Sequence, residues 1–319
     1  METRRLKLLV ELSRLGSMRA VAEVLDTTTS TVSQQIGALA AEVGTALIEP
    51  TGRRVRLTPA GRRLAERAVG ILAAVEAARH DLAPGAEPNG TLRVAGFATA
   101  IRAHLLPVVI GLAESHPRVR VLIREHEPAE AMELLAQDET DLALTYDYNL
   151  APAAENPAVH ATALWDAPWG LGVPAGASGP VRPEEPTVGT GPAGSGPVGT
   201  ATSVFARHAG HDWIVNSRNV ADETVIRTIA SMAGFTPRVT HQADSLDLVQ
   251  GMIAAGLGVG LLPVGTATFP GVRLLPLTAP DVRLRAYAVA GRGRLDWPPL
   301  ALVTELLLRR TRPPGRSGA

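Results

Sequence analysis

Residues 27–36 read TTTSTVSQQI, five hydroxyl residues in a row followed by Val-Ser-Gln-Gln-Ile. Val32 and Ile36 lie four positions apart, which is typical of one face of a helix. A buried helix face does not favour so many small polar side chains, and a loop does not need that apolar spacing. The stretch therefore predicts a helix that carries a hydroxyl-rich surface.

The flanking sequence predicts two further short helices. Between residues 4 and 40, apolar residues recur at spacings of three and four, and the pattern breaks at residues 16–17 and 26–28. Three such helices bury a core only if they pack on one another. Residues 18–41 then form an amphipathic helix, a polar turn and a second helix that begins near Thr28, which is a helix-turn-helix.

The second helix of this motif presents its N-terminal side chains to the major groove of DNA. Val32, Ile36 and Leu39 face inward, so the polar residues between them face outward. Hydroxyl groups can bond bases or phosphates, and a glutamine can pair with adenine. We predict DNA contacts from Thr28, Thr29, Ser30, Ser33 and Gln34. Helix capping and turn formation are the alternative for Thr27 and Thr28.

Residues 47–57, LIEPTGRRVRL, alternate apolar and basic residues around a Pro-Thr-Gly turn and predict a short hairpin, or wing. Thr58 and Pro59 then predict the start of a long helix, as N-cap and first helical residue. An apolar heptad follows: Leu64, Ile71 and Ala78 form one column, and Ala68, Val75 and Leu82 form the other. So narrow a stripe predicts a seam between two helices. Packing of this helix on its own domain is the alternative.

After a hinge-like segment, PGAEPNG at 84–90, strand and helix patterns alternate, which predicts a parallel sheet with crossover helices. The predicted strands are 91–97, 119–125, 141–146, 212–216, 237–242, 259–263, 272–277 and 284–290, and the predicted helices are 101–115, 128–137, 221–234, 245–256 and 298–310. A Pro- and Gly-rich stretch at 174–199 interrupts the alternation. Asp138, Glu139 and Asp141 are interpreted as a solvated loop before a strand.

Residues 16–61 resemble the DNA-binding domain of LysR-type transcriptional regulators. The matching positions are Gly16, Ser17, Val21, Ala22, Glu23, Leu25, Val32, Ser33, Ile36, Leu39, Gly44, Leu47, Leu57, Thr58 and Gly61. The resemblance continues through 105–121, 141–144, 234–239 and 254–263, and so covers about residues 4–310. Many spaced motifs in the right order make it specific.

The chain departs from the family pattern at the wing. Ile48 and Pro50 replace the usual Phe and Arg, and Ala40 replaces a Glu. The second wing arginine is kept as Arg53 and is followed by Arg54, and the resemblance assigns both to DNA contact. Loss of one arginine is expected to remove one phosphate contact and to lower DNA affinity.

The resemblance also implies the domain organisation. We expect a winged helix-turn-helix over 1–58, a linker helix for dimerisation over 59–83, a hinge at 84–90, an effector-binding domain over 91–310 and a disordered tail at 311–319. The effector-binding domain would consist of two α/β subdomains of periplasmic-binding-protein type, I (91–163 and 268–310) and II (164–267), with a small ligand between them.

Candidate effector contacts follow predicted strands, where ligands of open parallel sheets bind. By resemblance Thr99 occupies an effector-contacting position, and helix capping is its alternative role. His126, Tyr146 and Asn216–Ser217–Arg218 lie at other strand ends. Arg218 could pair with a ligand carboxylate, and an exposed loop arginine is its alternative.

The totals exclude several functions. Of 319 residues none is cysteine, which excludes disulfides, cysteine zinc sites and thiol catalysis, and the formal net charge is zero. The N-terminus does not read as a signal peptide, and no uncharged apolar run approaches the ~18 residues of a membrane span. GTGPAG at 189–194 lacks the strand–turn–helix context of a nucleotide site. We therefore expect a cytoplasmic protein without cofactor, metal or catalytic site.

The leading hypothesis is a bacterial LysR-type transcription factor that binds promoter DNA as a homodimer or as a dimer of dimers (a homotetramer). A small-molecule effector, of unknown identity, would modulate this binding. A constitutive DNA-binding regulator without effector is the serious alternative. A solute-binding receptor is less favoured because of the N-terminal eighty residues and the lack of a signal-peptide pattern. An enzyme on an α/β scaffold is less favoured because the sequence shows no acid–base or nucleophile arrangement.

Overall fold

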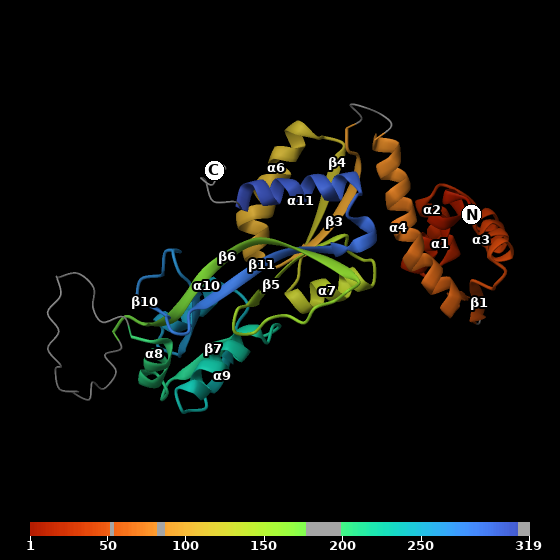
Figure 1. The fold of residues 1–319 in the computed structure, drawn as a ribbon. Coiled ribbons are helices and arrows are strands. Elements are labelled where there is room, and N and C mark those ends of the chain that lie inside the picture. The colour runs from red at the N-terminus through yellow and green to blue at the C-terminus, as the bar shows by residue number, and fades with distance from the viewer. Residues whose placement is uncertain (52–53, 82–86, 177–198, 312–319) are drawn as a thin grey trace, which may run out of the picture.

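The N-terminal part of the chain is a bundle of three helices with a short hairpin (Figure 1). The structure, a computed structural model, describes residues 1–51, 54–81, 87–176 and 199–311. Helices α1 (Thr3–Leu15), α2 (Met18–Val24) and α3 (Thr29–Val43) share one core, and strands β1 (Ile48–Thr51) and β2 (Arg54–Leu57) pair in antiparallel register. The predicted winged helix-turn-helix is confirmed. Arg53 lies outside the described residues.

The linker helix α4 (Pro59–Asp81) begins at a tightly fitted junction. The Thr58 Oγ1 accepts a hydrogen bond from the Gly61 amide at 3.0 Å and donates one to the Ala46 carbonyl at 2.7 Å. A Cβ on Gly61 would lie 2.0 Å from the Leu47 carbonyl oxygen, so only glycine fits there. The predicted cap at Thr58 is present and joins the wing to the helix.

The predicted heptad stripe of α4 is divided between two environments. Leu64 and Ala68 pack in the N-terminal core, where α4 lies along α1. Ile71, in the same column as Leu64, is 39% exposed. The alternative of packing within the domain therefore holds for the first turns of the helix, and Ile71 leaves apolar surface exposed farther along it.

Residues 87–176 and 199–311 form a long curled sheet flanked by helices (Figure 1). The strand order is β4-β3-β5-β11-β6-β9-β7-β8, with β10 paired to β6. The strands are β3 (Gly90–Gly96), β4 (Val119–Glu125), β5 (Leu142–Tyr148), β6 (Val159–Pro174), β7 (Asp212–Val215), β8 (Arg238–Gln242), β9 (Val259–Pro263), β10 (Val272–Pro276) and β11 (Val282–Gly291). The helices are α5 (Ala98–Ala100), α6 (Leu106–Ser115), α7 (Pro128–Ala136), α8 (Ala201–Arg207), α9 (Ala221–Met232), α10 (Leu246–Ala254) and α11 (Pro298–Thr311), with short helical turns η1 (Ile101–Leu105) and η2 (Arg292–Arg294).

The expectation of a parallel sheet is correct only for the two ends of this sheet. β3 lies parallel to β4 and β5, and β7 lies parallel to β8 and β9. Between them β11 and β6 are antiparallel to each other and to their neighbours. We call the part around β3–β5 lobe I and the part around β7–β9 lobe II. β6 pairs with β11 from Val159 to Trp169 and with β9 and β10 over its remaining C-terminal part, so it runs from one lobe to the other.

The helix predicted over 101–115 is not regular. It begins as α5, passes through the π-helical turn η1 and continues as α6. Pro107, near the start of α6, has no amide hydrogen to donate, and a wider turn before it removes the need for that bond. The Pro- and Gly-rich stretch and GTGPAG at 189–194 lie almost entirely outside the described residues.

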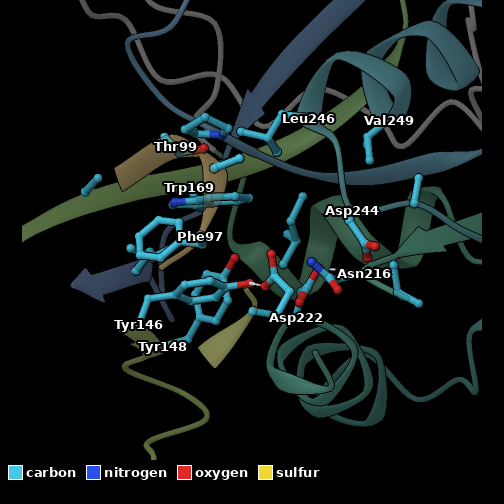
Figure 2. A pocket seen from close by; sticks show the side chains of 18 of the residues that line it. Phe97, Thr99, Tyr146, Tyr148, Trp169, Asn216, Asp222, Asp244, Leu246 and Val249 are labelled. Atoms are coloured by element: carbon cyan, nitrogen blue, oxygen red, sulfur yellow. Dashed lines mark hydrogen bonds between the residues drawn. The ribbon is translucent and has the colours of Figure 1, made fainter. Parts of the chain in front are cut away.

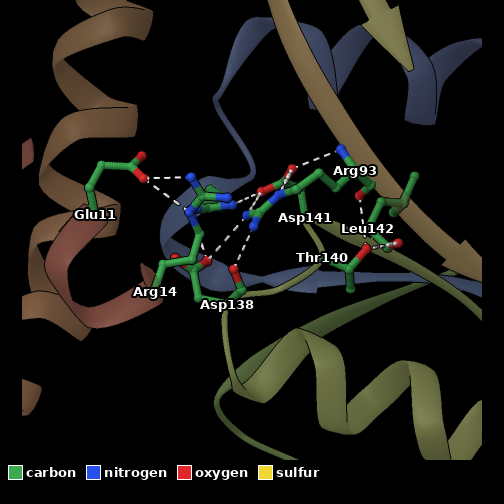
Figure 3. Close-up of polar contacts among 8 residues, drawn as sticks. Glu11, Arg14, Arg93, Asp138, Thr140, Asp141 and Leu142 are labelled. Atoms are coloured by element: carbon green, nitrogen blue, oxygen red, sulfur yellow. Dashed lines mark hydrogen bonds and ion pairs between the residues drawn. The ribbon is translucent and has the colours of Figure 1, made fainter. Parts of the chain in front are cut away.

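The two domains meet between α4 and η2, beside a group of ion pairs (Figure 3). Arg93 donates from Nε and Nη2 to the two carboxylate oxygens of Asp141 at 3.0 and 2.7 Å, and Arg294 pairs with Asp138 at 2.9 Å and with Asp141. Asp141 is 2% exposed, so the expectation of a solvated loop is wrong for it. Glu11 on α1 is close enough to act on the partly buried Arg294, whose pKa is lowered by burial and raised in part by Asp138 and Glu11.

Candidate functional site

The first candidate site is the exposed side of α3. Thr29, Ser30, Ser33 and Gln34 are all exposed, whereas Val32, Ile36 and Leu39 are completely buried. A helix anchored by three buried side chains holds its outer face rigidly. This arrangement leaves the four polar side chains free to contact a partner.

Thr28, the fifth residue predicted on this face, caps α3. Its Oγ1 accepts from the Thr31 amide at 3.1 Å and lies 2.8 Å from the hydroxyls of Ser30 and Thr31. The capping role proposed as its alternative is therefore present, and a contact with DNA would have to share the hydroxyl. Ser30 is exposed, but its hydroxyl would likewise have to share or give up the contact with Thr28 to bind a partner.

The wing offers fewer free cations than its sequence indicates. The guanidinium of Arg56 donates to Glu49 across the hairpin, from Nη2 at 2.6 Å and from Nε at 3.0 Å. Arg54 is the first residue of β2, paired with Thr51. Pro50, which replaces the family's arginine, pairs with Val55 and extends the hairpin without a charge.

The second candidate site is a cavity between lobes I and II, which we call the interlobe cavity (Figure 2). Lobe I contributes the end of β3 with the start of α5, the loop before α7, and β5. Lobe II contributes the ends of β7 and β9, the first turn of α9, the loop after β8, and α10. β6 and β11 form one wall. The polar and aromatic residues of the lining include Phe97, Thr99, Glu127, Tyr146, Tyr148, Trp165, Trp169, Asn216, Asp222 and Asp244.

Three of the residues predicted to bind an effector line the interlobe cavity: Thr99, Tyr146 and Asn216. The Tyr146 hydroxyl donates to the Glu127 Oε2 at 3.0 Å. The Asn216 side-chain oxygen accepts from the amides of Arg218 and Asn219, which fixes the turn after β7. Thr99 is the second residue of α5, whose N-cap position is Phe97, so the helix-capping role given as its alternative is not present.

The other three, His126, Ser217 and Arg218, lie near the cavity but outside its lining. Arg218 donates from Nε to Asp244 at 2.8 Å and pairs with Glu130 of α7 at 3.3 Å, so it links lobe II to lobe I. His126 lies 3.3 Å from the same Glu130. Hydrogen bonding to Asp244 raises the pKa of Arg218. Its charge is thus already balanced by carboxylates of the protein.

Sequence reasoning missed the acidic and aromatic part of the lining. Glu127 is 5% exposed, and burial raises its pKa, against a smaller opposing effect of the Tyr146 hydrogen bond. Burial also raises the pKa of Asp222 from 3.8 to about 6. Trp165 and Trp169 come from β6, a strand that was not predicted. The positions of Glu127 and Asp222 at helix starts after strands were the available signal.

Comparison with known proteins assigns both parts of the chain to one family. The model described as LysR substrate binding domain matches residues 85–312, more than half of the chain, and the model described as bacterial regulatory helix-turn-helix protein, lysR family, matches residues 3–62. The transcriptional dual regulator GltC of Bacillus subtilis (strain 168) is 27% identical over 301 residues, 92% of each chain.

Solved structures share the fold. Full-length OxyR from Pseudomonas aeruginosa, a point variant, superposes with a TM-score of 0.68 at 21% identity and covers 98% of this chain and 95% of its own. Full-length CbnR in complex with its target DNA superposes with a TM-score of 0.50 at 21% identity, over 98% of this chain and 100% of its own. Within the described residues no helix is long and apolar enough to span a membrane.

Proposed function

The chain belongs to the LysR family of bacterial transcriptional regulators, and we propose that it reads promoter DNA with the exposed side of α3 and senses its effector in the interlobe cavity. One observation carries this assignment of sites. The same chain joins a rigidly anchored helix with a polar outer face to a cavity between two lobes, through the linker helix α4.

Ser33 and Gln34 are proposed to contact base edges, with Thr28, Thr29 and Ser30 closer to the backbone at the start of the helix. Arg53 and Arg54 are proposed to contact phosphates from the wing. Phosphate contacts set affinity and its dependence on salt, whereas base contacts set sequence preference. The two groups are therefore separable by experiment.

Thr99, Tyr146 and Asn216 are proposed to contact the effector directly, because they line the interlobe cavity. His126, Ser217 and Arg218 are proposed to act at its rim. Arg218 joins the lobes through Asp244 and Glu130, so a ligand that changes the separation of the lobes changes these ion pairs. Such a ligand shifts the population towards the closure that it binds better.

A short path connects the cavity to the DNA-binding domain. β11 lines the cavity at Leu284 and ends at Gly291, where η2 begins. η2 in turn lies against α4, which carries the winged helix-turn-helix. We propose that rotation of the lobes about β6 and β11 moves η2 and alters the spacing of two DNA-binding domains in an oligomer. The predicted subdomain boundaries, at 163/164 and 267/268, belong to the same proposal.

The relatives of this chain are transcriptional regulators. We propose that the chain has no enzymatic activity and acts in the cytoplasm, where its DNA target lies. A regulator that binds DNA without an effector is the second candidate. The altered wing at Pro50 does not distinguish this regulator from an effector-responsive one.

The test is a titration of the purified full-length protein with the intergenic DNA upstream of its own gene. Unrelated DNA of equal length serves as the control, and both are measured at about 50 and 200 mM salt. We expect preferential binding of the intergenic DNA and loss of that preference in Ser33→Ala and Gln34→Ala, with the salt dependence unchanged. Equal binding of both DNAs by the parent protein at both salt concentrations would contradict sequence reading by α3.

A further inference from the structure

The interlobe cavity is walled by aromatic rings that meet at steep angles (Figure 2). Phe97 and Tyr146 have ring centroids 4.8 Å apart at 71°, and Tyr148 and Trp169 have centroids 5.5 Å apart at 87°. Trp165 lies 6.3 Å from Phe97. Rings at right angles present both faces and edges to one enclosed space. Ring faces carry partial negative charge and attract cations.

The charges of the lining have one sign. Glu127, Asp222 and Asp244 line the cavity, and no lysine, arginine or histidine does so among the described residues. Arg218 is the cation beside them, and it lies outside the lining in ion pairs with Asp244 and Glu130. An anionic ligand would therefore meet repulsion from Glu127 and Asp222, the two lining carboxylates that make no ion pair among the described residues.

One of these carboxylates has an oxygen without a partner. The Asp222 Oδ2 accepts from the Asn216 amide at 3.1 Å, whereas the Oδ1 is buried and makes no hydrogen bond. A buried acceptor without a donor is costly, and Asp222 lines the cavity, so a donor carried by a ligand would relieve that cost. The partner that suits a carboxylate oxygen best is a positively charged donor.

Three of the helix starts around the cavity, those of α7, α9 and α10, are already occupied by acidic side chains of the protein, whereas the start of α5 carries none. Asp222 lies in the first turn of α9, Glu127 is the N-cap of α7, and Asp244 comes just before α10. Helix N-termini attract anions because their free amides and dipole are positive there. Since the chain supplies its own anions at these three places, they do not serve a ligand carboxylate.

We propose that the interlobe cavity binds an organic cation, an amine or related ammonium compound, whose charge is received by Asp222 and Glu127 and whose apolar part packs against Trp165 and Trp169. This inference rests on the proposed role of the cavity as the effector site. It replaces the expectation of a ligand carboxylate held by Arg218. Arg218 keeps its place in the ion pairs that join the two lobes.

Three probes of one shape and different charge test the proposal: benzylamine, benzyl alcohol and benzoate. Each is titrated into the full-length protein by calorimetry at pH 7. We expect benzylamine to bind at least about tenfold more tightly than benzoate, with benzyl alcohol between them, since one desolvated charge contact is worth at least this factor. Benzoate binding as tightly as benzylamine, or no binding of benzylamine, would overturn the proposal.

Two variants separate the charge from general damage to the cavity. Asp222→Asn is expected to weaken benzylamine at least about tenfold and to leave benzyl alcohol unchanged. Asp247→Asn, the same substitution in the first turn of α10 but exposed and outside the lining, is expected to change neither. Equal benzylamine affinity in Asp222→Asn and the parent, with benzyl alcohol still bound, would refute the role of Asp222.

A pH series gives a further readout. Asp222 is in the field of Asp244 and Glu223, and Glu127, Tyr146 and Tyr148 face it from lobe I. As pH falls through about 6, Asp222 takes up a proton, so benzylamine binding should weaken while benzyl alcohol binding stays constant.

The DNA titration and the benzylamine titration give independent results. If the protein prefers the intergenic DNA but does not bind benzylamine, only the inference of a cationic ligand is refuted. If it binds benzylamine but shows no DNA preference, only the proposed sequence reading by α3 is refuted.

Discussion

Gly70 of α4 and Gly293 of η2 lie backbone against backbone. A Cβ on Gly70 would come within 3.3 Å of the Gly293 Cα, and a Cβ on Gly293 would come within 3.0 Å of the Gly70 Cα. Glycine in the middle of a helix destabilises it by roughly 0.5–1 kcal/mol relative to alanine. The close approach is a physical reason for glycine at position 70, because it lets the linker helix and the effector-binding domain touch.

Gly70→Ala and Gly293→Ala are expected to separate η2 from α4. Hydrogen–deuterium exchange should rise in both segments, because a side chain between the two backbones forces them apart. Gly111→Ala is the matched control, since no atom lies within 4 Å of a Cβ placed there in the exposed helix α6. The control should gain about 0.5–1 kcal/mol of stability from helix propensity. If Gly70→Ala gains as much with unchanged exchange, the contact does not constrain the linker.

The ion pairs beside this contact predict a large loss of stability. Asp141 is almost completely buried and pairs with both Arg93 and Arg294. Asp141→Asn leaves two partly buried cations short of a counter-charge, which typically costs about 3–5 kcal/mol. Urea unfolding with intrinsic fluorescence measures it. Glu305→Gln, which breaks an exposed pair with Arg309 on α11, should change the free energy of unfolding by less than about 1 kcal/mol. Equal losses in both variants would contradict a structural role for Asp141.

Local sequence patterns predicted most of the helices and strands. They did not predict which polar side chains are buried, because burial depends on residues that are distant in the sequence. The spacing of Val32, Ile36 and Leu39 predicted α3, and Thr58 with Pro59 predicted the start of α4, because these signals lie within one turn of helix. Asp141 was interpreted as solvated because its partners Arg93 and Arg294 are 48 and 153 positions away in the sequence. No local pattern records such pairs.

The strand β6 was missed for a different reason. Its sequence, VHATALWDAPWGLGVP, contains two prolines and two glycines, all at or after position 168, and such residues normally indicate a turn or the end of a strand. Without β6 the tryptophans of the interlobe cavity had no place in the fold. The sequence therefore predicted the polar residues at strand ends, Thr99, Tyr146 and Asn216, but gave no sign of the aromatic wall facing them.

Asp222 predicts an unusual dependence of stability on pH. Burial raises its pKa to about 6 in the folded protein, against 3.8 for the ordinary group. Between these values the folded state binds more protons than the unfolded state, so the stability contributed by Asp222 falls as pH rises from about 4 to 6 and is constant above. A shift of about two pKa units corresponds to a loss of about 3 kcal/mol at pH 7.

Asp222→Asn should therefore make the unliganded protein more stable at pH 7 than the parent, by up to about 3 kcal/mol, and should reduce the decline between pH 4 and 6. Chemical unfolding at a series of pH values measures this. Asp247→Asn, exposed in the first turn of α10, should leave the profile unchanged. If Asp222→Asn is less stable than the parent at pH 7, the carboxylate has a stabilising partner in the folded protein. In that case Asp222 would no longer be explained as a group that is kept for function although it lowers stability.

The wing predicts a variant with increased DNA affinity. Arg56 is held by Glu49 at 2.6 Å, and both side chains are exposed, at 67% and 40%. Glu49→Gln removes the counter-charge and leaves Arg56 free to contact a phosphate, in place of the arginine absent at Pro50. Each added phosphate contact steepens the dependence of log K on log salt by about 0.9. Titrations against one DNA at about 50 and 200 mM salt should therefore show several-fold tighter binding, with the larger gain at low salt.

Glu305→Gln changes the net charge equally but lies on α11, so it should leave the salt dependence unchanged. The same gain in both variants would assign the effect to net charge, and a gain confined to Glu49→Gln, abolished by adding Arg56→Gln, would assign it to the wing.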